Sequence, residues 1–357
     1  MDPATYDEDV YRAKLLQQMR RSETIVYQAI FVPENFTDGG ETMLVAATSL
    51  GLIHVYLLGR VLTPEYWEQV SQGFGGDQDF RVWKWRDILS AVRDPAKAKT
   101  LTPTHVDQLP RRPIGSRGAL PPLMEINDMA VNKETGHLFL AGGDSVVHEW
   151  DLTTQQFTRQ FEGHTDYVHA VRFLQHSQEL VTGSEDGTLG IWDVRTDKNV
   201  AFLRPHGATT HATSTSSSVP SWWIGAVAHD RSETWLACGG GTKRSYETPA
   251  TGGFFSMWHL PSRVPVHVTT TMCDVRDVAF HDMDLLSVGN EARLKKWNRS
   301  LGHLVAAATS TVPSCYFCAV DPRTDLIAVG GVAPAIDIYT MPGVVSFTLL
   351  AEDAEAL

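Results

Sequence analysis

Residues 161–195 constrain the fold more than any other stretch of the 357-residue chain. They read FEGHTDYVHAVRFLQHSQELVTGSEDGTLGIWDVR, with a Gly-His pair, two apolar runs, a Glu-Asp-Gly turn and a terminal Trp-Asp pair. Short β-prone runs joined by a turn that reverses the backbone predict a small antiparallel sheet. One such sheet cannot bury both of its faces, so further copies are expected on either side of it.

Polar residues at fixed places in this segment predict how its strands are fastened together. A unit that starts with Gly-His and ends with Trp-Asp is typical of a WD repeat, which forms one blade of a β-propeller. In WD repeats the histidine, a strand hydroxyl, the turn aspartate and the closing tryptophan form one hydrogen-bonded chain. We expect this lock to consist of His164, Thr182, Asp186 and Trp192.

Weaker copies of the repeat run nearly from end to end of the chain. Each has an apolar strand, a turn and a closing aromatic residue, and these aromatics are Tyr56, Trp83, Trp150, Trp192, Trp258, Trp297 and Tyr339. We therefore predict an all-β, seven-bladed WD-repeat β-propeller. Only 27 residues separate Tyr56 from Trp83, against 42 between Trp150 and Trp192, so the second blade is expected to be incomplete.

Repeats of this extent predict one closed ring rather than two domains. We expect the propeller to span residues 23–350, after an N-terminal helical extension at 1–22 and before an acidic tail at 351–357. Prolines, Ser/Thr-rich composition or an interrupted strand pattern mark three irregular loops inside the ring, at 86–122, 208–221 and 242–253.

The N-terminal extension reads as an amphipathic helix. Thr5 and Glu8 form a capping box, and Tyr11 and Leu15 lie on one helical face. This helix either packs across the ring or docks onto a partner protein. In the second case Tyr11 and Leu15 are candidate partner contacts.

The charge distribution limits nucleic-acid binding to one local stretch. A net charge of −12 argues against a surface that binds nucleic acid as a whole. Between residues 81 and 118, however, nine Lys and Arg stand against three acids. This stretch is either a solvated loop or a contact for an acidic protein or RNA phosphate, with Arg111 and Arg112 as the candidate contacts.

Two adjacent tryptophans, Trp222 and Trp223, open the fifth predicted blade. Side chains alternate along a strand, so one indole is expected in the core and the other on the ring surface. Exposed tryptophan is enriched at interface hot spots, and Trp222 is a candidate partner contact.

No catalytic, cofactor or metal motif accompanies the repeats. HExxH, GxSxG and Walker patterns are missing from the sequence. Cys315 and Cys318 point to opposite faces of a predicted strand, which disfavours a shared metal. No apolar run reaches the roughly 18 to 20 residues that span a bilayer. We expect a protein that is not an enzyme, has no cofactor or metal and does not enter a membrane.

Several short elements, in this order, resemble the THO complex subunit 6 family between about residues 123 and 300. They are EIN at 125–127, LAGGD at 140–144, FTR at 157–159, HTDY at 164–167, WIG at 223–225, CGGG at 238–241 and WHL at 258–260. The pair Arg111-Arg112, ahead of EIN, also resembles the family. The shortened second blade and the insertions at 208–221 and 242–253 depart from it.

This resemblance implies a non-catalytic nuclear scaffold of the THO/TREX assembly, which couples transcription and mRNA processing to mRNA export. It also implies contact with the other THO subunits, especially the coiled-coil fifth and seventh subunits, and support of a larger oligomer. RNA contact would be indirect or limited to the basic loop.

A rival interpretation rests on the terminal WDVR of the best repeat. The form WDxR occurs in propellers that act as substrate receptors of cullin–RING ubiquitin ligases, and Arg195 would then contact the ligase adaptor. The motif is short and also occurs in WD proteins without this role.

Overall fold

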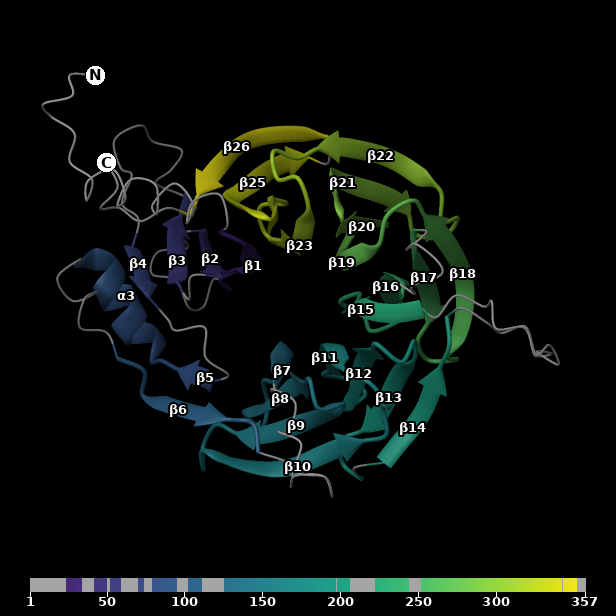
Figure 1. Cartoon of the computed structure of the whole chain (residues 1–357), viewed down its shortest axis with the longest axis horizontal. Helices are drawn as coiled ribbons and strands as arrows, with labels where there is room; N and C mark the ends of the chain where they lie inside the picture. Colours follow the sequence, from purple (N-terminus) through teal and green to yellow (C-terminus); the bar gives the residue numbers. More distant parts are fainter. Residues whose placement is uncertain are drawn as a thin grey trace, which may run out of the picture.

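The computed structural model describes residues 24–33, 42–49, 52–58, 70–73, 79–94, 102–110, 125–196, 198–205, 222–243, 252–341 and 343–351. Their strands form six four-stranded antiparallel sheets and one two-stranded sheet around a central axis (Figure 1). The predicted helix at 1–22, the loop at 208–221 and residues 352–357 of the tail lie outside the described residues.

Each four-stranded sheet is one blade. Its four strands are consecutive in the sequence and are arranged in that order from the central axis to the rim. The inner strands are β1 (Val26–Phe31), β7 (Ile126–Asn132), β11 (Val168–Leu174), β15 (Trp222–His229), β19 (Val275–His281) and β23 (Cys315–Val320). The second strands are β2 (Met43–Thr48), β8 (His137–Gly142), β12 (Glu179–Ser184), β16 (Trp235–Thr242), β20 (Asp284–Gly289) and β24 (Ile327–Gly331).

The outer halves of the blades follow the same order. The third strands are β3 (Leu52–Leu57), β9 (Val146–Asp151), β13 (Leu189–Asp193), β17 (Gly253–His259), β21 (Glu291–Asn298) and β25 (Ala333–Met341). The rim strands are β4 (Val70–Gly73), β10 (Gln156–Glu162), β14 (Lys198–Leu203), β18 (Val264–Thr271), β22 (Leu304–Thr309) and β26 (Val344–Leu350).

The all-β propeller is confirmed, but the count of seven blades is wrong, because the described residues form six. At the place of the expected incomplete blade lies a two-stranded sheet of β5 (Asp79–Val82) and β6 (His105–Gln108). Between them runs the helix α3 (Trp85–Arg93). The loop expected to be irregular from 86 to 122 therefore contains a helix, which ends before Pro95, and a strand. We call residues 79–110 the bridging segment.

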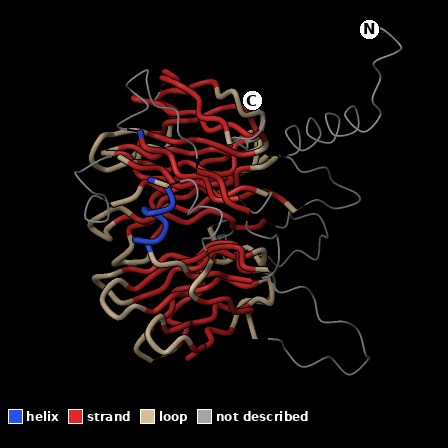
Figure 2. The backbone as a smooth tube through the Cα atoms, turned by 90° about the vertical axis from the view of Figure 1, so that its left-hand side faces the viewer, coloured by secondary structure: helices blue, strands red, loops and turns tan. Residues whose placement is uncertain are grey.

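The bridging segment fills the interval between the first blade and the β7–β10 blade (Figure 1). Ala91 of α3 belongs to an apolar cluster with Met43 and Val55 of the first blade. Phe80 of β5 packs edge-on against Trp150 of β9, with ring centroids 5.0 Å apart. Figure 2 shows α3 at the outside of the ring, with strands above and below it. Side-chain packing thus takes the place of a full blade.

Ring closure depends on packing between the first and last blades. No strand is shared between them, since β1–β4 and β23–β26 are separate sheets. Their facing side chains form one buried cluster, which includes Leu44 of β2 and Phe317 of β23. The Tyr56 hydroxyl also donates a hydrogen bond to the carbonyl of Leu350, at 3.2 Å.

Every inner strand has a register shift near its start, where one extra residue forms a β-bulge. The bulged residues are Tyr27, Asn127, His169, Gly225, Arg276 and Tyr316. A bulge turns one side chain away from the alternating pattern of the strand. The same irregularity therefore recurs near the start of all six inner strands.

Candidate functional site

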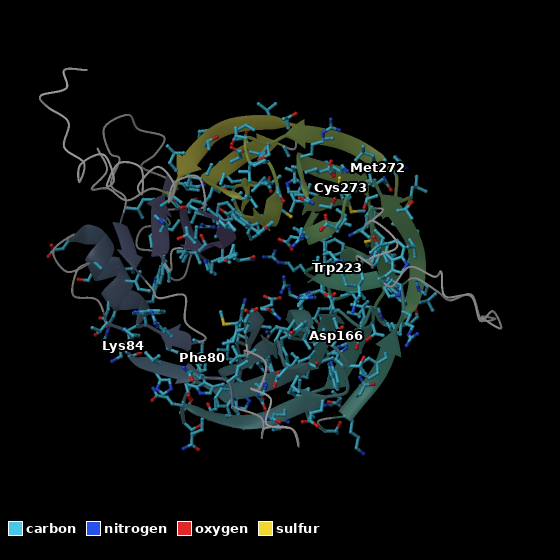
Figure 3. All side chains as sticks on the ribbon, in the orientation of Figure 1. Phe80, Lys84, Asp166, Trp223, Met272 and Cys273 are labelled. Carbon is cyan, nitrogen blue, oxygen red and sulfur yellow. The ribbon has the colours of Figure 1, made fainter. Side chains whose placement is uncertain are left out.

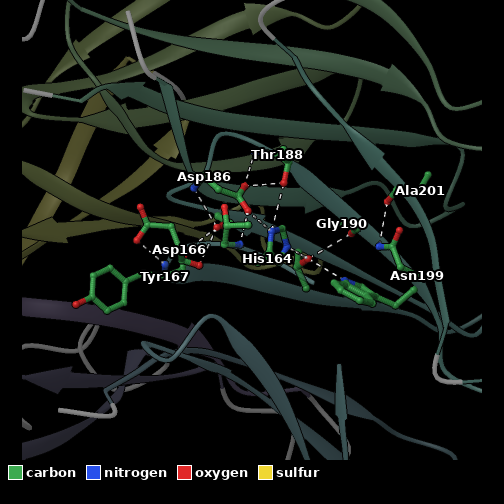
Figure 4. A network of polar contacts seen from close by, with 12 residues as sticks. His164, Asp166, Tyr167, Asp186, Thr188, Gly190, Asn199 and Ala201 are labelled. Atoms are coloured by element: carbon green, nitrogen blue, oxygen red, sulfur yellow. Dashed lines mark hydrogen bonds and ion pairs between the residues drawn. The ribbon is translucent and has the colours of Figure 1, made fainter. Parts of the chain in front are cut away.

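The β11–β14 blade contains a continuous chain of polar contacts (Figure 4). Trp192 Nε1 donates to Thr182 Oγ1 at 2.9 Å, and Thr182 Oγ1 lies 2.7 Å from His164 Nε2. His164 Nδ1 lies 2.9 Å from Asp186 Oδ2. A neutral histidine that donates from Nδ1 accepts at Nε2, so the Thr182 hydroxyl donates to His164. The structure thus brings together the four residues expected to lock the blade.

Asp186 joins this chain to the turn and to the loop before β11. Its Oδ2 accepts from the Thr165 amide at 3.0 Å, and its Oδ1 accepts from the Thr188 amide at 2.9 Å. Burial alone would raise the pKa of Asp186, but hydrogen bonds from His164, Thr188 and Thr165 hold it well below its ordinary value. The carboxylate therefore acts as a charged structural anchor rather than as a proton donor.

The closing aromatics of the other five blades share the register of Trp192, but their polar contacts differ from blade to blade. Each lies on a third strand opposite an aliphatic residue of the second strand, as Trp192 lies opposite Leu180. These pairs are Tyr56–Leu44, Trp150–Leu138, Trp258–Leu236, Trp297–Leu285 and Tyr339–Ile327. Trp83 departs from the pattern, since it follows the end of β5 and lies on no third strand.

The residue two positions after the aliphatic partner decides whether the indole finds an acceptor. Ser287 occupies this position in the β19–β22 blade and accepts from Trp297 Nε1 at 2.7 Å. Leu140 occupies it opposite Trp150, and Cys238 opposite Trp258. Among the described residues, no acceptor meets Trp150 Nε1, and Trp258 faces the weakly accepting sulfur of Cys238. Among the described residues, the complete chain of polar contacts is therefore found in the β11–β14 blade. The closing aromatic residue, by contrast, is present in all six blades.

Sequence reasoning missed a set of acidic residues that connect neighbouring blades. Asp128 of β7 accepts from the Val171 amide of β11 at 3.0 Å and bonds to the Arg172 guanidinium. Asp277 of β19 accepts from the Cys318 amide of β23 at 2.9 Å. Both acids directly follow a bulged residue, which is the signal that could have identified them.

Asp277 and Arg172 also line a cavity of about 420 Å³ whose walls come mainly from inner strands. Burial raises the pKa of Asp277 to about 6, although Arg172 opposes this rise. Asp277 already accepts from two backbone amides, those of Val278 and Cys318. These contacts assign the carboxylate a role in blade packing. Among the described residues no group of His, Cys, Asp and Glu side chains is arranged to hold a metal ion.

The two adjacent tryptophans are both half-buried, and they have different surroundings. Trp222 packs edge-on against the buried Phe254, at 5.4 Å between centroids, and borders a core cluster. Trp223 instead lies beside the central opening of the ring (Figure 3). The Arg276 guanidinium lies 5.6 Å from the centroid of its ring. Trp223 is therefore the better candidate for a partner contact, and the sequence could not tell the two apart.

Two glycines make room for the Trp223 indole. A Cβ atom on Gly225 would lie 2.4 Å from Trp223 Cζ3, and one on Gly241 would lie 3.1 Å from Nε1. Gly241 is also the cross-strand partner of Trp223. The WIG and CGGG elements thus both supply a glycine that leaves space for the Trp223 side chain. An aromatic residue paired with glycines is the sequence signal that could have identified Trp223.

The remaining candidate partner contacts are placed only in part. The Arg195 side chain is 72% exposed and pairs with Asp193 of its own turn, at 3.1 Å from Nε to Oδ1. Tyr11, Leu15, Arg111 and Arg112 lie outside the described residues.

Comparison with known proteins identifies the family. The family model described as the nucleolar protein 10-like, N-terminal domain, a β-propeller, matches residues 124–346. THO complex subunit 6 of Arabidopsis thaliana is 26% identical over 96% of this chain and 96% of its own length. THO complex subunit 6 of Homo sapiens is 28% identical over 77% of this chain and 72% of its own length. These matches confirm the resemblance expected from the short sequence elements.

The described part of the chain holds no helix with the length and apolar character needed to cross a membrane. Blade order, closing aromatics and the family match all describe the same ring. The chain belongs to the nucleolar protein 10-like, N-terminal-domain family of β-propellers and is a relative of the THO complex subunit 6 proteins.

Proposed function

We propose that the chain is a non-catalytic subunit of a THO complex in the nucleus. It would serve as a scaffold that supports assembly and oligomerisation of the complex and links transcription and mRNA processing to mRNA export. The observation that carries this proposal is the extent of the match to the Arabidopsis thaliana relative, 96% of both chains. A single WD repeat shared between unrelated propellers would not extend over both chains in this way.

The chemistry of the ring supports a scaffold rather than an enzyme. The charged and polar residues of the lock bond to one another, and the inter-blade acids bond to backbone amides. Groups engaged in this way hold blades in place and are not available to a substrate. A closed ring whose blades are held together by such contacts keeps its surface shape when partners bind, which is what an assembly subunit needs.

Charge favours protein partners over RNA. A chain with a net charge of −12 repels free RNA at long range. We propose the other THO subunits as partners, in particular the coiled-coil fifth and seventh subunits. RNA contact would then be indirect, or restricted to the basic loop that contains Arg111 and Arg112.

Affinity purification of the tagged chain from nuclear extract, with nuclease treatment and mass spectrometry, tests the proposal. We expect the THO subunits to be recovered after nuclease treatment, because the contacts are between proteins. Loss of these subunits on nuclease treatment would contradict the scaffold role and favour tethering by RNA.

The same experiment tests the rival role as a receptor of a cullin–RING ligase. Arg195 is exposed enough to contact an adaptor. Recovery of a cullin adaptor without THO subunits, and its loss in the Arg195→Ala chain, would support the rival. Arg195→Ala should leave recovery of the THO subunits unchanged.

A further inference from the structure

Aromatic and cationic side chains from four successive blades meet near the starts of the inner strands, where Trp223 lies beside the central opening (Figure 3). We call His169, Trp223, Arg276 and Tyr316 the mouth cluster. His169, Arg276 and Tyr316 are bulged residues, and Trp223 covers the place of the fourth bulged residue, Gly225. The cluster therefore results from an irregularity repeated around the ring.

Contacts within the mouth cluster show that the four side chains lie side by side. His169 and Trp223 are 6.2 Å apart between ring centroids. The Arg276 guanidinium lies 5.6 Å from the Trp223 centroid and 5.3 Å from that of Tyr316. Because β19 lies between β15 and β23, Arg276 receives one aromatic neighbour from each side. Cation–π contacts of this kind hold a guanidinium in a fixed orientation.

Arg276 has donors that the ring does not use. Its Nε donates to Asp274 Oδ2 at 2.8 Å, and the side chain is 41% exposed. Among the described residues none accepts from its Nη1 or Nη2. The two terminal nitrogens of an oriented guanidinium form a fork that matches the two oxygens of a carboxylate.

The acidic side chains near the mouth cluster are already bonded, so they do not favour a basic partner. Lys243 Nζ lies 2.7 Å from Asp166 Oδ2 and 3.6 Å from Glu185 Oε1. His169 Nε2 lies 2.6 Å from Glu185 Oε2. The mouth therefore offers unused donors on Arg276 but few unused acceptors. Aromatic and arginine side chains are also the residue types most often found at interface hot spots.

We propose that the mouth cluster binds an acidic segment of a protein partner, with an Asp or Glu carboxylate on the Arg276 fork and apolar neighbours on Trp223 and Tyr316. The proposal goes beyond membership in a THO complex and does not rest on it. The purified chain alone should bind such a segment.

Fluorescence anisotropy with the purified full chain tests this binding. The probe is a fluorescein-labelled peptide rich in glutamate and leucine, and the comparison peptide has glutamine in place of every glutamate. We expect the glutamate peptide to bind about tenfold more tightly or better, because it forms charge-assisted hydrogen bonds. Arg276→Gln should remove this preference, and Trp223→Ala should weaken binding of both peptides.

Arg195→Gln is the matched control. Arg195, like Arg276, is exposed and donates from Nε to the aspartate two residues before it, but no aromatic contact holds it. The Arg195→Gln chain should bind the glutamate peptide as the unaltered chain does. Circular dichroism and thermal melting establish that each variant is folded.

Equal binding of the two peptides, or an Arg276→Gln chain that keeps the preference, would overturn the proposal. So would Arg276-dependent binding of a lysine-rich peptide or of a fluorescein-labelled oligouridylate in place of the acidic peptide. Affinity purification with the Arg276→Gln chain tests the two proposals separately. If this chain still recovers THO subunits, the proposed function holds whether or not the mouth cluster binds an acidic peptide.

Discussion

The β11–β14 blade and the β7–β10 blade before it close on tryptophans at the same register, yet only one indole finds an acceptor. Trp192 donates to Thr182, whereas Trp150 lies near Leu140 and its Nε1 meets no acceptor in the part of the chain that the structure describes. Both tryptophans are completely buried or nearly so. The closing position therefore depends on apolar burial, and the hydrogen bond is an addition to it.

The two blades also use a turn aspartate and a histidine in different ways. In the β7–β10 blade, Asp144 Oδ2 lies 3.0 Å from Nε2 of His148, only four residues further along the chain. In the β11–β14 blade, Asp186 bonds to His164, which precedes the inner strand by four residues. The Asp144–His148 pair holds one turn together. The Asp186–His164 pair connects the loop before β11 to the turn between β12 and β13. Sequence separation between the partners thus decides how much of a blade one His–Asp contact stabilises.

The largest expected effect comes from Trp192→Ala. Removal of the indole leaves a cavity between neighbouring blades, and the free energy of unfolding should fall by roughly 3 to 5 kcal/mol. Urea denaturation followed by circular dichroism measures this change. An unchanged midpoint would contradict the role of Trp192 in closing the blade.

Asp186→Ala should be the next most costly change. It removes the acceptor of several donors, including the buried His164 Nδ1 and the Thr188 amide, at a cost of about 3 kcal/mol. Asp144→Ala, measured in the same urea titration, should cost about half as much, because the contacts that Asp144 makes with His148 and with the Val146 amide lie within one turn. Equal losses would show that sequence separation between the partners does not matter.

Replacement of each tryptophan by phenylalanine isolates the hydrogen bond from the burial. Trp192→Phe leaves Thr182 without the indole donor, whereas Trp150→Phe removes no hydrogen bond. The first change should therefore lower the free energy of unfolding by about 1 kcal/mol more than the second. If the two losses are the same, the lock contributes no net stability through its indole.

The smallest effects should appear in the pH dependence of stability. Asp186 holds its proton less tightly in the folded state, so its contribution is present above about pH 4 and is lost as the pH falls below this value. Asp277, with a pKa of about 6, holds its proton more tightly when folded. Its contribution is therefore full below about pH 4 and is lost as the pH rises through 6.

Urea midpoints measured between pH 3 and 8 separate these two groups. Asp277→Asn should flatten the profile between about pH 5 and 7, and Asp186→Asn should flatten it below about pH 4. A profile that neither substitution changes would mean that other groups set the pH dependence.

The sequence predicted the regular blades because each repeats the same register. A closing aromatic faces an aliphatic residue on the second strand in all six blades, and this regularity is visible as spacing. The bridging segment was not predictable in this way. Its helix and two short strands follow no repeat, and Phe80 and Ala91 are buried by contacts with different blades.

The candidate site was predictable where its residues belong to the repeat and not elsewhere. His164 and Asp186 occupy fixed places in a WD unit, so their contact could be expected. Trp223 depends on Gly225, which follows it, and on Gly241, which faces it from the next strand. That second partner is known only once the strand register is known, which explains why Trp222 was chosen instead.

The joint between the first and last blades has a mechanical consequence. Successive blades elsewhere are connected by the chain itself. In the described residues β1–β4 and β23–β26 share no strand pair and meet through side-chain contacts such as Leu44, Phe317 and the hydrogen bond from Tyr56 to the Leu350 carbonyl. Tension applied between residues 24 and 351 would therefore separate this joint without breaking a strand pair. A partner that binds both end blades at once would raise the force needed to open the ring.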